Sequence, residues 1–218
     1  MASVLPVMFT AIGGGALVVL MLSAARKQSQ RAHANVEKLA AQLGLTVAPA
    51  TKRFGFWSKP RASGRFREKQ AELFTYTTGS GKSRVRWTAL AVKPRDSGGF
   101  TFCLARQGLG TRISELFGAR EITVGDPAFD AAWFIQTNQP EFFQAALIPE
   151  LRARLTAVFE KTGRTYRSGS FKLEKDAVVY SEVGDFGDEE RCRRIARISE
   201  VLSDFADAAD VFAESKNA

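Results

Sequence analysis

The chain contains a single histidine, and this scarcity excludes several kinds of catalytic and metal site. His33 has no neighbouring cysteine or acidic cluster, so neither a Ser-His-Asp nor a Cys-His centre can be assembled around it. The two cysteines, Cys103 and Cys192, are far apart and lack the spacing of zinc ligands. The sequence therefore predicts no catalytic centre, no metal site and no cofactor.

Complete glycine-rich nucleotide-binding loops are missing as well. Gly81-Lys82-Ser83 resembles the end of a P-loop, but Tyr76 stands where that motif requires its first glycine. The segment also joins two strand-like runs, which favours a hairpin turn. Gly108-Leu109-Gly110 lacks the third glycine of a dinucleotide fingerprint, and we expect a loop there.

Acidic residues are scarce in the first half of the chain, so the charge is strongly asymmetric. The net charge of the whole chain is +8. Residues 26–120 contain 19 Lys and Arg against 5 Asp and Glu, whereas residues 121–218 contain 12 against 18. Such an asymmetry points to an anionic partner, either lipid head groups or nucleic acid.

The longest uncharged run begins near the N-terminus. Val4 to Leu22 contains 19 residues without a charge, enough for a helix to cross a hydrocarbon core of roughly 30 Å. A cleaved signal peptide is the alternative, but no Lys or Arg precedes the run, and the run is longer than a signal core. We expect a transmembrane anchor over residues 1–25. Basic residues follow it, which predicts that the N-terminus faces out and the domain faces the cytoplasm.

The rest of the chain has the pattern of an α+β domain. Residues 26–44 predict a stalk helix with one apolar face, and residues 45–218 predict one domain. Residues 63–107 alternate strand-like runs with turn residues, which is typical of an antiparallel meander. A final helix opening at Asp185 has an apolar stripe. We expect an N-terminal transmembrane helix, then an antiparallel sheet covered by helices, with a long C-terminal helix.

Aromatic and basic residues are interleaved between Lys52 and Lys69. This mixture suits a membrane interface, and it also suits single-stranded nucleic acid. A third interpretation places the rings in the core and the cations in solvent. We expect lipid contact, because the predicted anchor would hold the segment near a bilayer. The predicted lipid-contact residues are Arg26, Lys27, Arg31, Lys52, Arg53, Phe54, Phe56, Trp57 and Lys59.

Two carboxylates offer the alternative of a chemical site. Asp126 and Asp130 share one short segment, and paired carboxylates can perform acid–base chemistry or bind a cation. Helix capping by Asp126 explains the first without chemistry, since Pro127 follows it at a position suited to the start of a helix. We favour the structural interpretation of both residues.

One stretch of the chain resembles a known group of proteins. The segment from Gly125 to Ile135, followed by Pro140-Glu141-Phe142 and by residues 147–152, resembles a loose group of uncharacterised bacterial single-pass membrane proteins. The resemblance implies a bacterial origin and a location in the inner membrane. It carries no assigned activity, so it implies no functional residues.

These patterns favour a membrane-anchored cytoplasmic interaction module over an enzyme. The expected partners are the lipid bilayer and another membrane protein, nucleic acid is not favoured, and the oligomeric state is left open. The alternative is an enzyme or small-ligand sensor that uses Asp126 and Asp130. A concave pocket containing both carboxylates would favour that alternative.

Overall fold

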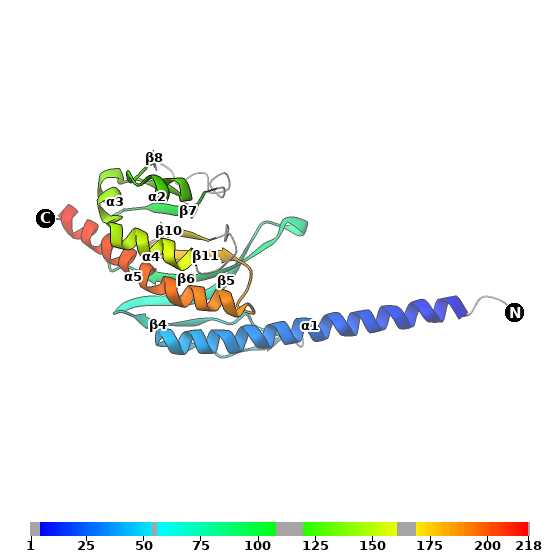
Figure 1. Cartoon of the computed structure of the whole chain (residues 1–218). Helices are drawn as coiled ribbons and strands as arrows, with labels where there is room; N and C mark the ends of the chain where they lie inside the picture. Colours follow the sequence, from blue (N-terminus) through cyan, green and yellow to red (C-terminus); the bar gives the residue numbers. More distant parts are fainter. Residues whose placement is uncertain (1–4, 54–55, 108–119, 161–168, 218) are drawn as a thin grey trace.

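The computed structural model describes residues 5–53, 56–107, 120–160 and 169–217 (Figure 1). Its centre is a nine-stranded sheet in which every neighbouring pair is antiparallel, in the order β1-β4-β5-β6-β11-β10-β7-β9-β8. The strands are β1 (Leu45–Val47), β4 (Ala62–Phe66), β5 (Lys69–Thr78), β6 (Val85–Lys93), β7 (Phe102–Arg106), β8 (Arg120–Glu121), β9 (Trp133–Thr137), β10 (Ser170–Glu174) and β11 (Ala177–Val183).

The strand order departs from a simple meander at one point. The hairpin β10–β11 lies between β6 and β7, although both of its strands come later in the chain. Lys175 and Asp176 make its turn with positive φ angles of 52° and 62°, and Tyr180 and Phe171 face each other across it in the register. The last hairpin of the sequence therefore supplies two central strands of the sheet. Strands β6 and β7 become part of one sheet only through residues 170–183.

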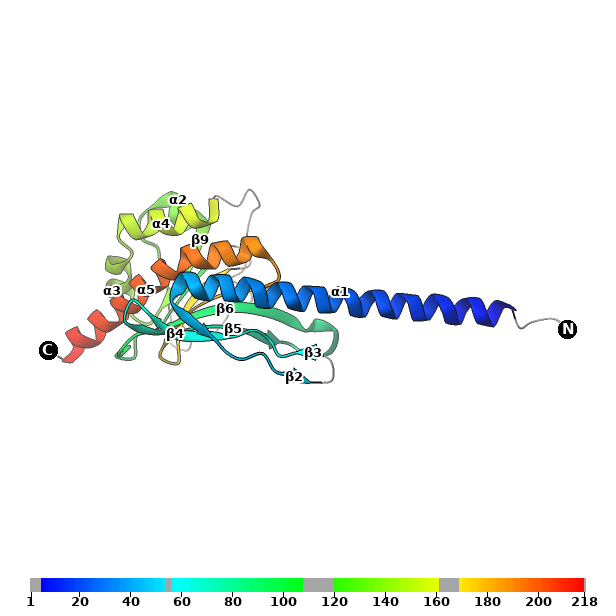
Figure 2. The same cartoon turned by 90° about the horizontal axis from the view of Figure 1, so that it is seen from below.

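The helices gather on one face of the sheet (Figure 2). They are α1 (Leu5–Leu43), α2 (Pro127–Ala132), α3 (Pro140–Ala146), α4 (Pro149–Glu160) and α5 (Glu189–Asn217). The apolar stripe of α5 packs on the core: Ile195, Leu202 and Phe205 are fully buried, and Phe212 at its end is partly buried. The predicted α+β class, antiparallel sheet and long C-terminal helix are therefore confirmed.

Phenylalanine rings form the centre of the core between the sheet and the helices. Phe102 of β7 stacks on Phe143 of α3 with ring centroids 4.5 Å apart, and it contacts Phe205 of α5 at 4.9 Å. Phe171 of β10 joins the same cluster at 5.8 Å from Phe205. Close aromatic pairs of this kind add to the free energy gained from burial. The high Phe content of the chain is thus explained by packing.

The predicted transmembrane helix is wrong. Among the residues that the structure describes, no helix is both long and apolar enough to cross a membrane. The uncharged run is part of one continuous helix of 39 residues, α1, which continues through Arg26, Lys27 and Arg31 to Leu43. Buried Val36 and Leu39 pack the last third of α1 against the domain. The predicted single-pass topology and inner-membrane location depended on this helix, and they are wrong as well.

The start of the last helix also differs from the prediction. Asp188, and not Asp185, lies directly before the helix and accepts a hydrogen bond from the backbone N–H of Arg191 at 3.2 Å. Asp185 instead accepts from Gln28 of α1 and Arg86 of β6, at 2.9 and 3.0 Å. The loop before α5 therefore ties the helix α1 to the sheet.

Candidate functional site

The predicted basic-aromatic segment forms a small hairpin near α1. Strand β2 (Lys52–Arg53) pairs with β3 (Phe56–Trp57), while Phe54 lies outside the described residues. The side chain of Trp57 is 42% exposed and meets the ring of His33 on α1 edge-on, with centroids 6.1 Å apart. His33 Nε2 also donates to the carbonyl of Ser58 at 2.9 Å. These contacts place the segment beside the part of α1 that carries Arg31.

The strands β5 and β6 extend past their neighbours as a two-stranded projection, which we call the β5–β6 arm (residues 74–87). Strand β4 pairs with β5 only as far as Leu73, and β11 pairs with β6 only from Trp87 onward. A 3-10 turn, η1 (Gly81–Ser83), connects the strands at the tip. The arm projects from the same end of the domain as the stretch of α1 before Gln28, the residue that bonds to Asp185, and we call this stretch the free part of α1 (Figure 1).

The base of the arm is fixed by two aromatic residues. The rings of Tyr76 and Trp87 stack with centroids 6.1 Å apart and an interplanar angle of 9°. Trp87 Nε1 donates to Thr78 Oγ1 at 2.7 Å. Burial raises the pKa of the Tyr76 phenol, and a hydrogen bond with Ser181 opposes that shift. The arm is therefore anchored by side chains, which gives its tip a defined direction.

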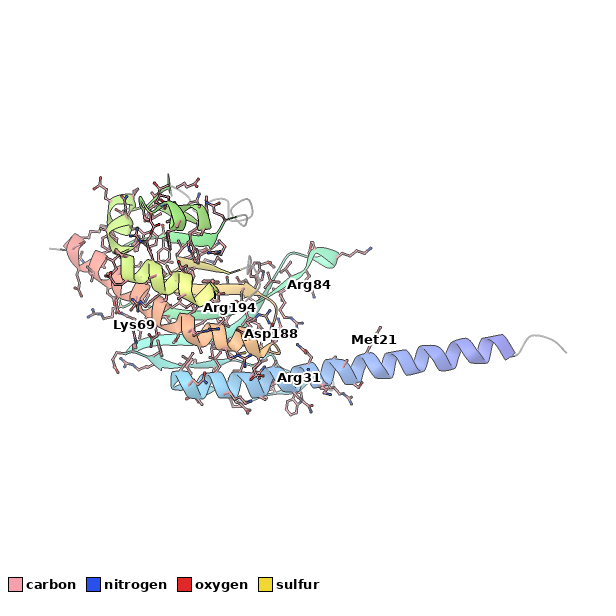
Figure 3. All side chains as sticks on the ribbon, viewed as in Figure 1. Met21, Arg31, Lys69, Arg84, Asp188 and Arg194 are labelled. Carbon is pink, nitrogen blue, oxygen red and sulfur yellow. The ribbon has the colours of Figure 1, made fainter. Side chains whose placement is uncertain are left out.

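Exposed cations gather at the end of the domain from which α1 and the arm project, and we call this surface the basic end. Lys59 lies between the two projections and donates to Thr77 Oγ1 at 3.4 Å. In Figure 3, Arg31 and Arg84 lie at this end on either side of Asp188. Within the described part of the chain, the cations of the basic end make no ion pair; they are Arg26, Lys27, Arg31, Lys59, Lys82 and Arg84.

Three acidic residues in the loop before α5 and in its first turn have internal partners. Asp185 lies 3.0 Å from Arg86, and Asp188 lies 3.4 Å from Arg191. Glu190 pairs with Arg193 at 2.9 Å, and the hydrogen bond from Arg193 holds the pKa of Glu190 below its usual range. The charge left over for a partner at this end is therefore positive.

Sequence reasoning found part of the basic end and missed the rest. Of the predicted lipid-contact residues, five are exposed at this end: Arg26, Lys27, Arg31, Trp57 and Lys59. For Lys52, Arg53 and Phe56 only the backbone is described. The arm residues Lys82, Arg84 and Arg86 were passed over because the segment was interpreted only as a turn followed by a strand. The sequence signal that could have identified these arm residues was the complete lack of Asp and Glu between Glu72 and Asp96.

The two carboxylates of the alternative site both accept hydrogen bonds from the backbone. Asp126 caps α2, with Oδ1 accepting from the N–H of Phe129 at 3.2 Å. Asp130 accepts from the N–H groups of Val124 and Gly125 at 2.9 and 3.1 Å. These bonds fix the loop before α2. The two carboxylates therefore have a structural role in this loop. Chemistry at Asp126 and Asp130 stays a prediction, and we propose no function from it.

A shallow groove of about 380 Å³ runs between α4 and α5. Ala157 and Ala196 are among the residues that line it. The charged lining residues have partners: Arg154 lies 2.7 Å from Asp204, Glu200 lies 3.4 Å from Arg67, and Arg197 lies 3.3 Å from Glu190. Among the described residues, no three His, Cys, Asp or Glu side chains are placed to hold a metal ion. The groove therefore gives no indication of catalytic chemistry.

A buried ion cluster joins the sheet to α5 beneath the basic end. Glu182 of β11 is fully buried, and its two oxygens accept from Nε and Nη2 of Arg194, each at 2.9 Å. Arg191 Nε lies 2.7 Å from the same carboxylate, and Tyr180 donates its hydroxyl to it at 2.6 Å. A side chain at Gly184, where φ is +124°, would collide with Arg191. The cluster therefore fixes where α5 begins and where its preceding loop meets α1.

A second buried pair fixes the other end of α5. Lys69 of β5 contacts Asp210 and lies 3.0 Å from Asp207. Asp210 also accepts from the backbone N–H groups of Arg95 and Asp96 at 2.6 and 3.2 Å. Burial acts to raise the pKa of Asp210, but the hydrogen bonds from Lys69 and the two N–H groups outweigh it and lower the pKa.

No protein-family model matches the chain, and no curated protein matches it. Among solved structures, the chain is similar to the crystal structure of the mycobacterial trehalose monomycolate transport factor A, TtfA. The match has 12% sequence identity, covers 84% of this chain and 94% of that chain, and has a TM-score of 0.50. At this identity the likeness is one of fold.

Proposed function

We propose that this chain is a non-enzymatic interaction module whose basic end binds an anionic lipid surface. The observation that supports it most directly is the set of exposed, unmatched cations at one end of the domain, beside the exposed ring of Trp57. Cations near such a surface contribute about 1 kcal/mol each, and Trp is favoured at the interface. The solved structure of similar fold is that of a protein named a transport factor.

A lipid surface fits the basic end better than a nucleic acid strand does. The cations are spread over α1, the β3–β4 connection and the arm, and they do not follow a single groove. Single-stranded nucleic acid is bound in a basic groove with rings open for base stacking. Here the ring of Trp57 meets His33, and those of Tyr76 and Trp87 stack on each other. We therefore expect the chain to bind oligonucleotides only weakly.

Neutralising two cations on α1 tests this proposal. The variant Arg26→Gln with Arg31→Gln keeps residues of good helix propensity on an exposed face. We expect its binding to vesicles containing about one-third anionic phospholipid to weaken roughly 25-fold, because each cation contributes about 1 kcal/mol. Co-sedimentation of the full chain with anionic vesicles measures the change, and neutral vesicles give the reference.

A matched control removes two charges from the opposite end of the sheet. Lys93 is exposed at the end of β6 that lies away from the arm tip, and Lys175 is in the β10–β11 turn. Lys93→Gln with Lys175→Asn changes the net charge equally, and Asn tolerates the positive φ angle of Lys175. Equal loss of binding in the control and the α1 variant would mean that only net charge matters, which would contradict a basic-end site.

A further inference from the structure

We propose that the β5–β6 arm is a second contact with the same anionic lipid surface, separate from α1. This inference rests on the proposed function and adds an element that the sequence pattern did not single out. The arm is the part of the sheet that extends past both neighbouring strands. A two-stranded projection has no packing role at its tip, so the residues there are available to a partner.

Charge is the first observation that supports this role. Between Glu72 and Asp96 the chain has five Lys and Arg residues and no acid. Two of these cations, Lys82 and Arg84, are exposed at the tip, and within the described residues neither makes a hydrogen bond or an ion pair with the rest of the protein. A tip of this composition is complementary to phosphate-bearing head groups. It would be repelled by a basic partner.

The direction of the arm is the second observation. Figures 1 and 3 show the arm and the free part of α1 extending from the same end of the domain, with Arg84 on the arm and Met21 on α1. Arg31 lies where α1 begins to pack on the domain, next to buried Ala32. The two projections are separate elements that leave the domain at one end. They can meet an extended surface together, and a bilayer is such a surface.

Anchoring of the arm is the third observation. The stacked rings of Tyr76 and Trp87 and the hydrogen bond from Trp87 to Thr78 hold its base. Arg86, one residue before Trp87, is held by Asp185, which also accepts from Gln28 of α1. The arm and α1 are therefore joined through one carboxylate. A joined pair of contacts binds a surface more tightly than either alone, because the second contact forms within the same complex.

The test uses the full chain with Lys82→Gln and Arg84→Gln, alone and combined with the α1 variant. Vesicles containing about one-third phosphatidylglycerol in phosphatidylcholine and a single-stranded oligonucleotide are the two probes. We expect the arm variant to bind the anionic vesicles roughly 25-fold more weakly than the unmodified chain. The combined variant keeps only Lys27 and Lys59 of the basic-end cations, and it is expected to bind the anionic vesicles more weakly than either double variant. Lys82→Arg with Arg84→Lys, which keeps both charges, should retain binding.

The outcomes separate the two proposals. If the arm variant binds vesicles as tightly as the unmodified chain while the α1 variant does not, the arm inference is wrong and the proposed function stands. If the unmodified chain does not distinguish anionic from neutral vesicles, the proposed function is wrong and the arm inference falls with it. If the arm variant loses only oligonucleotide binding, the arm contacts nucleic acid, and the lipid assignment is overturned.

Discussion

Replacing Glu182 by Gln is expected to lower the free energy of unfolding by about 3–5 kcal/mol, because it breaks a buried ion pair by removing one partner. Glu182 and Arg194 are both fully buried. The carboxylate is shared by Arg194 and Arg191 and also accepts from Tyr180. Gln has nearly the same shape but no charge, so two buried guanidinium groups would lose the anion that they share.

Denaturant unfolding followed by circular dichroism measures this loss. Glu174→Gln is the matched control, because Glu174 is exposed at the end of β10, and a surface change of this kind is expected to alter stability by less than about 0.5 kcal/mol. A Glu182→Gln protein as stable as the Glu174→Gln protein would show that the cluster does not hold α5 against the sheet.

Replacing Asp210 by Asn is expected to cost about 2–4 kcal/mol, somewhat less than the loss at Glu182, because Lys69 keeps a second partner in Asp207. The side chain of Asp210 is only 4% exposed. Besides Lys69, it accepts hydrogen bonds from two backbone N–H groups, at Arg95 and Asp96. Asp207 is 61% exposed, so Asp207→Asn is the control and should cost less than about 1 kcal/mol. Equal losses of stability in the two variants would contradict the conclusion that the buried contacts of Asp210 fix this end of α5.

The same pair gives a pH dependence whose direction follows from the pKa shifts. The pKa of Asp210 is lowered, so its stabilising contribution is present above the unfolded value of about 3.9 and is lost as the pH falls through the folded pKa. Burial opposes the charge of Lys69, but Asp210 and Asp207 outweigh it and raise its pKa. Its contribution is present below about 10.4 and is lost as the pH rises through the folded pKa. The difference between the unmodified chain and Asp210→Asn should be constant from about pH 5 to about pH 9 and shrink in acid.

Local patterns predicted the elements of the fold well. The apolar spacing in residues 195–212 predicted the buried face of α5, and the turn residues between 63 and 107 predicted a run of antiparallel strands. Both signals act over a few residues, so a single sequence contains them. The insertion of β10–β11 between β6 and β7 could not be predicted, because strand order depends on packing between segments that are far apart in the chain.

The errors have physical reasons of the same kind. The uncharged run was interpreted as an anchor, separate from a stalk helix over residues 26–44, because of its length and lack of charge. In the structure both belong to one helix, α1, whose last third packs on the domain. Asp185 was interpreted as a helix cap, but Gln28 and Arg86, which are distant in the sequence, occupy it. The partners of Glu182 and Asp210 are likewise set by tertiary contacts, and no local pattern marks them.

The most direct test of the central claim is the binding of the full chain to anionic and neutral vesicles at two salt concentrations. Exposed cations at the basic end should bind anionic vesicles strongly at about 0.05 M salt and weakly at about 0.5 M salt, because salt screens exposed charges. Neutral vesicles should bind little at either concentration. Equal binding to both kinds of vesicle, or binding to anionic vesicles that does not change with salt, would contradict an electrostatic contact at the basic end.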